Sequence, residues 1–284
     1  AIGDNALKMA TNSPGIAIGS GAADVMTNSG YLTIIGYNAL GSATGFATDS
    51  TAVGDNVLAA SLWTVASVGT AVGSSALAAN TTGDVNSALG YLALNANQTG
   101  SSLTAMGDNV LKLNTASNNT AVGSSAMAAN TSGTQNTAIG YLTLSANQTG
   151  SDNAAAGNNA LKLNTASQNT AAGSSALTAN TSGTLNSAAG YMAMSSNQTG
   201  SYNTAAGANA LAANVSSNNN TAFGSSALAS STGANNTAVG YQAGTAGAAN
   251  VSGTNNTFIG YQAQADANNY TNSTAIGYQA IVTA

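Results

Sequence analysis

The strongest constraint on the fold is an internal repeat that runs through nearly the whole chain. The phrase NTAIGYLTLSANQTG at residues 136–150 has close copies that begin at Asn86 and at Asn186. Residues 71–100 and 121–150 carry the same amino acid at 22 of 30 positions. Self-similarity at a fixed spacing is typical of architectures in which each repeat unit stacks on its neighbours.

A shorter period lies inside the 50-residue one. A glycine ends each word made of a small residue followed by an apolar one, and we call these the marker glycines. They lie 16 to 20 residues apart, mostly 16 or 17, at Gly3, Gly19, Gly36, Gly54, Gly73, Gly90, Gly107, Gly123, Gly140, Gly157, Gly173, Gly190, Gly207, Gly224, Gly240, Gly260 and Gly277. Three such units make one 50-residue super-repeat, so the sequence predicts about 17 coils of 16–17 residues.

We expect residues 1–284 to form a single repeat domain. Within it, residues 1–70 should form irregular coils, residues 71–240 the regular three-coil super-repeats, and residues 241–284 irregular terminal coils. Terminal units of repeat proteins are commonly atypical. Because Ala1 falls inside a repeat word, we expect the chain to be a piece of a longer protein.

The residues inside each unit favour short strands over helices. Gly residues and Asn-Thr clusters interrupt every unit before a stable helix could form. Two extended segments of about 3–5 residues per unit, separated by Gly, Asn and Ser turns, fit the pattern better. Stacked coil on coil, such segments form parallel sheets around a continuous interior. The predicted fold is therefore all-β, a parallel β-solenoid.

Each expected strand is apolar at two adjacent positions, as in Ala138 and Ile139. Because side chains alternate across a strand, one of the two should point into the coil and the other outward. We expect the larger residue to fill the coil and the alanine to allow close approach by another copy of the chain. A flattened coil that half-buries both residues within one chain is the alternative.

This interpretation assigns residues to two roles. The predicted inter-chain packing residues are Ala121, Ala138, Ala155, Ala188 and Ala205. The predicted coil core consists of Ile139, Leu144, Leu161 and Leu177. Both assignments follow from the size of the side chain at each repeat position.

Two further columns have a structural and a functional interpretation. Asn recurs four residues before many marker glycines, where stacked Asn side chains can hydrogen-bond along a solenoid. Tyr follows the marker in every third coil of the regular region, roughly 14 Å apart at the usual strand spacing. Each ring should cover a neighbouring coil while its hydroxyl reaches water. Alternatively, the tyrosines form a surface-contact stripe, made of Tyr91, Tyr141, Tyr191 and Tyr241.

Composition argues against several classes of function. Only 4% of residues are charged, eight Asp and three Lys, and there is no Glu, Arg, His or Cys. No catalytic triad can be assembled from this set, so we expect no enzyme activity and no cofactor. Three scattered Lys do not form the cationic surface that nucleic-acid binding requires. The Asp residues are dispersed, which disfavours a calcium site. No apolar run is long enough to span a bilayer. A single Thr column, without paired ranks, disfavours ice binding.

The repeated words resemble a known family. NTAVGSSAMA, NTAIGYLTL, NTAVGYQAG and STAIGYQA are similar to the head repeats of YadA-like trimeric autotransporter adhesins, and similar repeats occur in bacteriophage tail-fibre proteins. The resemblance implies a left-handed parallel β-roll that trimerises along its length, is displayed outside the cell and serves adhesion. The unit here is longer than the usual adhesin-head unit, and the chain shows no coiled-coil stalk or anchor.

Repeat and resemblance together predict an elongated homotrimeric fibre or adhesin segment, extracellular or at the cell surface, or on a virion. It would present a multivalent surface to a cell-surface glycan or protein receptor. Two alternatives stay open: a self-assembling extracellular filament subunit without a receptor, and a bacteriophage tail-fibre shaft.

Overall fold

The structure is a computed structural model that describes residues 1–7, 15–24, 28–29, 31–41, 46–48, 50–60, 66–67, 69–245, 252–266 and 269–283. These residues divide into two compact units. Unit 1 comprises Ala1–Leu142 with Asn147–Thr149, and unit 2 comprises Thr143–Ala146 with Gly150–Ala284. The described residues contain no helix, and the prediction of an all-β parallel β-solenoid is confirmed. About 14 turns can be followed, fewer than the 17 expected.

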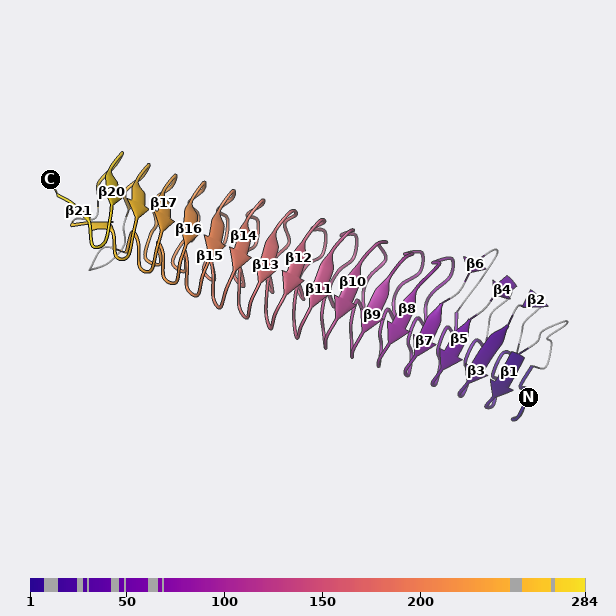
Figure 1. Ribbon diagram of the computed structural model, residues 1–284. Coiled ribbons are helices and arrows are strands. Elements are labelled where there is room, and N and C mark those ends of the chain that lie inside the picture. The colour runs from indigo at the N-terminus through magenta and orange to yellow at the C-terminus, as the bar shows by residue number, and fades with distance from the viewer. Residues whose placement is uncertain are drawn as a thin grey trace. The chain divides into compact units, whose positions relative to one another are not determined.

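In each unit, the coils contribute one strand apiece to a parallel sheet (Figure 1). The sheet of unit 1 contains β1 (Gly15–Ile18), β3 (Leu32–Ile35), β5 (Thr51–Val53), β7 (Thr70–Val72), β8 (Ser87–Leu89), β9 (Thr104–Met106), β10 (Thr120–Val122) and β11 (Thr137–Ile139). The sheet of unit 2 contains β12 (Ala154–Ala156), β13 (Thr170–Ala172), β14 (Ser187–Ala189), β15 (Thr204–Ala206), β16 (Thr221–Phe223), β17 (Thr237–Val239), β18 (Thr257–Ile259) and β20 (Thr274–Ile276).

The register of these sheets places like residues on like residues. In the pair β10–β11, Thr120 lies on Thr137, Ala121 on Ala138, and Val122 on Ile139. The same pattern holds between β16 and β17 in unit 2. Each sheet therefore carries a Thr-rich column, an inner Ala column and an outer column that is apolar.

The regular coils hold one strand each, so the expectation of two extended segments per unit is wrong for residues 71–240. The residues two and four positions after a marker glycine have positive φ, as Leu142 (53°) and Leu161 (49°) show. A left-handed backbone conformation cannot continue a strand, so this segment forms a tight corner instead. A second strand appears only in less regular coils, in β2 (Asn28–Ser29), β4 (Phe46–Thr48) and β6 (Ala66–Ser67), and in β19 (Gln264–Ala265) with β21 (Ile281–Val282).

The corner residues four positions after the marker fill the coil interior. Leu144, Leu161 and Leu177 are fully buried, which confirms their assignment to the core. Leucine rarely adopts positive φ, because its Cβ then crowds the backbone. The burial of a whole leucine side chain, about 1.5–3 kcal/mol, offsets this local cost in each coil.

Two columns of buried asparagines run through the interior beside the leucines. In the column before the strand, Asn186 Oδ1 accepts hydrogen bonds from the backbone N–H (3.0 Å) and the Nδ2 (3.1 Å) of Asn203. This confirms the expected Asn ladder. The second column follows the corner, and there Asn97 Nδ2 donates to Asn80 Oδ1 at 2.9 Å. Each Asn thus satisfies backbone groups that water cannot reach.

Replacing Asn186 by Ala should lower the free energy of unfolding by about 3 kcal/mol. The substitution removes the acceptor of both Asn203 donors and the Nδ2 that donates to the Gly200 carbonyl at 2.7 Å. Urea unfolding followed by circular dichroism measures the change. The exposed Asn158→Ala is the matched control, because Ala208 occupies the equivalent position of a later coil, and it should shift stability by less than about 0.5 kcal/mol. Equal effects of the two variants would show that the ladder contributes nothing.

The marker glycines allow consecutive coils to touch backbone to backbone. Gly190 has φ 137°, and a Cβ placed there would lie 2.6 Å from the carbonyl carbon and oxygen of Gly207 in the next coil. All 17 marker glycines have φ between 123° and 142°, a region that residues with a Cβ rarely adopt. The marker is therefore glycine because neither the conformation nor the space admits a side chain.

We expect Gly190→Ala to destabilise unit 2 by more than about 3 kcal/mol, since it adds steric overlap to backbone strain. Gly69→Ala serves as the control, because Gly69 lacks positive φ and a Cβ there would stay 3.3 Å from its nearest neighbour. Thermal melting of both variants checks the expectation. A Gly190→Ala variant that melts with the parent chain would contradict the close-contact argument.

Candidate functional surfaces

The strand side chains point in the opposite sense to the prediction. Ala138 is fully buried inside its own coil, whereas Ile139 is 48% exposed on the outer face of the sheet. The other alanines assigned to inter-chain packing are also buried within the chain, namely Ala121, Ala155, Ala188 and Ala205. The assignment of these alanines to an outward face is wrong, and so is the assignment of Ile139 to the coil core.

The reason lies in how little space the interior of a 17-residue coil leaves beside the strand. Each coil interior already holds a corner leucine or methionine and the asparagines of the two ladders. In the regular coils these side chains leave room for a methyl group beside the sheet, so the strand contributes alanine inward. In less regular coils Ile34 and Phe258 are buried at the same strand position. The alternative of two half-buried residues is wrong as well, because the alanine is buried completely and the larger residue stays outside.

The outward residue just before each marker glycine is apolar, and these residues form a continuous column along the sheet of each unit, which we call the outer apolar column. In unit 1 it comprises Ile18, Ile35, Val53, Val72, Leu89, Met106, Val122 and Ile139, and in unit 2 Ala156, Ala172, Ala189, Ala206, Phe223, Val239, Ile259 and Ile276. Over β7–β9, an open hollow of about 340 Å³ is lined by Val72, Leu89 and Met106 together with Thr70, Ser87 and Thr104. The sequence analysis identified this apolar position in each strand but predicted that its side chain points into the coil.

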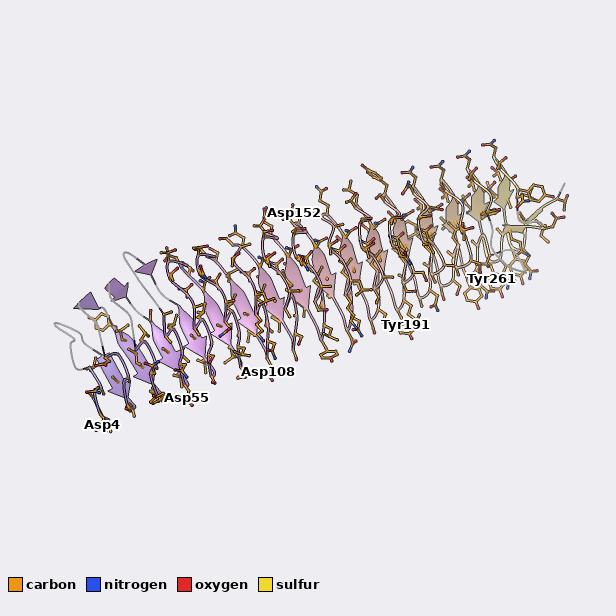
Figure 2. The ribbon with its side chains drawn as sticks, turned by 180° about the vertical axis from the view of Figure 1, so that it is seen from behind. Asp4, Asp55, Asp108, Asp152, Tyr191 and Tyr261 are labelled. Carbon is orange, nitrogen blue, oxygen red and sulfur yellow. The ribbon has the colours of Figure 1, made fainter. Side chains whose placement is uncertain are left out.

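The tyrosines after the marker lie at the corner of the coil, away from the sheet. Tyr91, Tyr141, Tyr191 and Tyr241 are all about half exposed, so the rings are accessible as the surface-contact stripe requires. In unit 2, Figure 2 shows Tyr191 and Tyr261 along one side of the coils and Asp152 on the opposite side. Whether the stripe contacts a partner stays a prediction.

At the last coils of unit 2 the tyrosines become consecutive and stack. The ring centroids of Tyr241 and Tyr261 lie 5.5 Å apart, and those of Tyr261 and Tyr278 lie 5.2 Å apart, with interplanar angles of 20° and 10°. Beside them, Gln262 Nε2 donates to Gln242 Oε1 at 2.8 Å, and Gln279 Nε2 donates to Gln262 Oε1 at 3.1 Å. Sequence reasoning missed this ladder, although its signal, the repeated word GYQA, was readable.

Ionisable side chains gather nowhere into a reactive group in the described residues. The aspartates of the described residues form no cluster of three that could hold a metal ion. Tyr270 donates a hydrogen bond to Asp266 Oδ1 at 2.8 Å, and this bond raises the pKa of the exposed Tyr270 hydroxyl.

Within the described part of the chain, no helix has the length and apolar character that a membrane crossing requires. Comparisons of the chain with protein-family models, with curated proteins and with solved structures found no match.

Proposed function

We propose that this chain is a segment of a homotrimeric fibre, displayed outside the cell or on a virion, that presents a repeated surface for adhesion. The observation that carries the proposal is the outer apolar column. Side chains as large as Leu89, Met106 and Phe223 are each more than 40% exposed, in unbroken succession with other apolar residues. Extended exposed apolar patches of this kind mark sites of protein–protein contact.

The sheet face around this column favours contact with a second copy of the same chain. The described strands contain no charged residue, so like faces can meet without repulsion. On each sheet a Thr-rich column runs parallel to the outer apolar column, as Thr137 and Ile139 of the same strand show. The threonines add hydroxyl groups along the edge of the apolar column. If the copies packed in parallel, equivalent coils of different copies would lie side by side, and the outer apolar column would be buried along its whole length.

Three copies and a left-handed coil are part of the proposal because the repeated words resemble those of trimeric adhesin heads. A trimer would display each exposed corner three times per level, so weak contacts to a receptor would add up to useful avidity. The function would then depend on the length of the fibre and on the number of repeated contacts, and each side chain would contribute because it recurs in many copies.

Substituting the outer column tests the interface. We expect the parent chain to sediment at three times its 27.2 kDa mass, and the double variant Leu89→Asp/Ile139→Asp to sediment at 27.2 kDa, because charged groups cannot be buried in the apolar strip without a partner. Sedimentation equilibrium gives the masses, and circular dichroism shows whether the coils stay folded. Tyr141→Ser, at a corner position that carries serine in Ser124, is the control and should leave the mass unchanged.

A parent chain that sediments as a folded monomer at micromolar concentration would overturn the trimer. A mass that grows without limit with concentration would instead identify the filament alternative.

Substituting the inner column gives a contrasting outcome. Ala138→Asp should unfold coils of unit 1 rather than release folded monomers, since Ala138 is buried inside its own coil. Circular dichroism and sedimentation of the same sample separate the two effects. A variant that remains fully folded but monomeric would show that Ala138 faces another copy after all.

A further inference from the structure

The tyrosine and glutamine ladders of the last coils form one continuous exposed corner. We define the Tyr–Gln corner as Tyr241, Gln242, Tyr261, Gln262, Tyr278 and Gln279. Its three rings are between 42% and 74% exposed, although each lies against the next. All six residues belong to unit 2, and each coil supplies one adjacent Tyr–Gln pair.

Stacking decides which chemical groups this corner offers to a ligand. The ring of Tyr261 has a tyrosine on each face, so it presents its edge and its hydroxyl. Each Gln carboxamide has two N–H donors, and the ladder uses one of those of Gln262 and Gln279. The corner therefore offers two parallel rows of neutral hydrogen-bonding groups, one Tyr–Gln pair per coil, with neighbouring tyrosine ring centroids 5.2–5.5 Å apart.

We propose that the Tyr–Gln corner binds a neutral, extended β-1,4-linked glycan that lies along the stacking direction of the coils. Such a glycan advances per sugar ring by nearly the distance that separates neighbouring tyrosine rings, so one sugar can lie beside each Tyr–Gln pair. Alternate sugars are turned over, and both of their edges carry hydrogen-bonding groups. Sugar hydroxyl and acetamido groups both donate and accept, as phenol and carboxamide groups do. This inference rests on the proposed adhesive function, whose ligand class it names, but it does not depend on the trimer.

Other linear polymers fit the corner less well. An extended peptide repeats its side chains on one face every 6.6–6.8 Å, about two strand residues, and would lose register by about 2.5 Å over two coils. A nucleic acid would need cations, and the words GYQAG, GYQAQ and GYQAI contain none. A charged glycan has no counter-charge in these words either. Repeat distance and neutrality therefore both favour the uncharged glycan.

The same unit contains a matched control position. Tyr191 occupies the corner position after its marker glycine, but Ser174 and Ala208 hold this position in the adjacent coils. It is as exposed as the stacked tyrosines and has no ladder on either side. If binding depends on consecutive tyrosines, substitution of Tyr191 should therefore leave the affinity unchanged.

Calorimetric titration of the full chain with cellohexaose, chitohexaose and maltohexaose tests the proposal. We expect both β-1,4-linked hexasaccharides to bind with Kd at or below the millimolar range, and the α-1,4-linked maltohexaose not to bind, because its chain coils and cannot follow a straight ladder. Tyr261→Phe keeps the ring stack and removes one hydroxyl, so it should weaken binding about fivefold without changing the melting temperature. The triple variant Tyr241→Phe/Tyr261→Phe/Tyr278→Phe should abolish detectable binding, and Tyr191→Phe should leave it unchanged.

Several results would overturn the inference. Absence of heat with both β-1,4-linked sugars at about 10 mM would do so, since three hydrogen-bonding steps support a Kd below that level. Equal binding of maltohexaose would remove the register argument, and undiminished binding by the triple variant would place the sugar elsewhere. Binding of an extended peptide that the triple variant loses, with no sugar bound, would assign the corner to a protein partner. Sedimentation of the same samples reports the trimer independently.

Discussion

Every residue in the regular coils has its own repeat equivalent as its neighbour in the coil above and in the coil below. This self-stacking constrains the whole structure, because a residue type persists in a column only if it tolerates a copy of itself one strand spacing away, about 4.8 Å. Asparagine does so, since the carboxamide of Asn197, for example, donates to Asn180 in one neighbouring coil and accepts from Asn214 in the other. Glycine does so where the coils touch, and alanine where the interior is narrow.

The same constraint explains why the chain carries almost no charge. Two carboxylates one coil apart would repel at a distance well inside the Debye length of about 8–10 Å. In unit 1 the position after the marker holds aspartate only in every third coil, at Asp4, Asp55 and Asp108, with serine and tyrosine in between (Figure 2). That spacing of roughly 14 Å lies beyond the Debye length. The three-coil super-repeat thus separates like charges by more than the distance over which they act.

Stacking also links the interior to the proposed functional surfaces. Because Leu161 and its equivalents accept a left-handed backbone to fill the coil, the corner is tight and the residue after the marker is pushed out to solvent. Because the interior of a regular coil is then full, its strand buries alanine, and the larger apolar neighbour stays outside. The packing that stabilises a single coil therefore creates both the outer apolar column, which we propose to be covered by other copies, and the exposed tyrosine corners.

The sequence by itself determined the repeat, the solenoid, the buried leucines such as Leu144 and the asparagine ladder, since each of these follows from residue type and spacing. It also located the apolar pair Ala138 and Ile139, yet it could not assign their directions. Alternation along a strand has two possible phases, and when both residues are apolar the pattern is the same in either phase. Only the tertiary structure decided between them, because in the regular coils the filled interior takes the methyl group of alanine and leaves the larger residue outside. In less regular coils Ile34 and Phe258 take the inner position. The stacking of Tyr241 on Tyr261 was likewise decided by the register of whole coils.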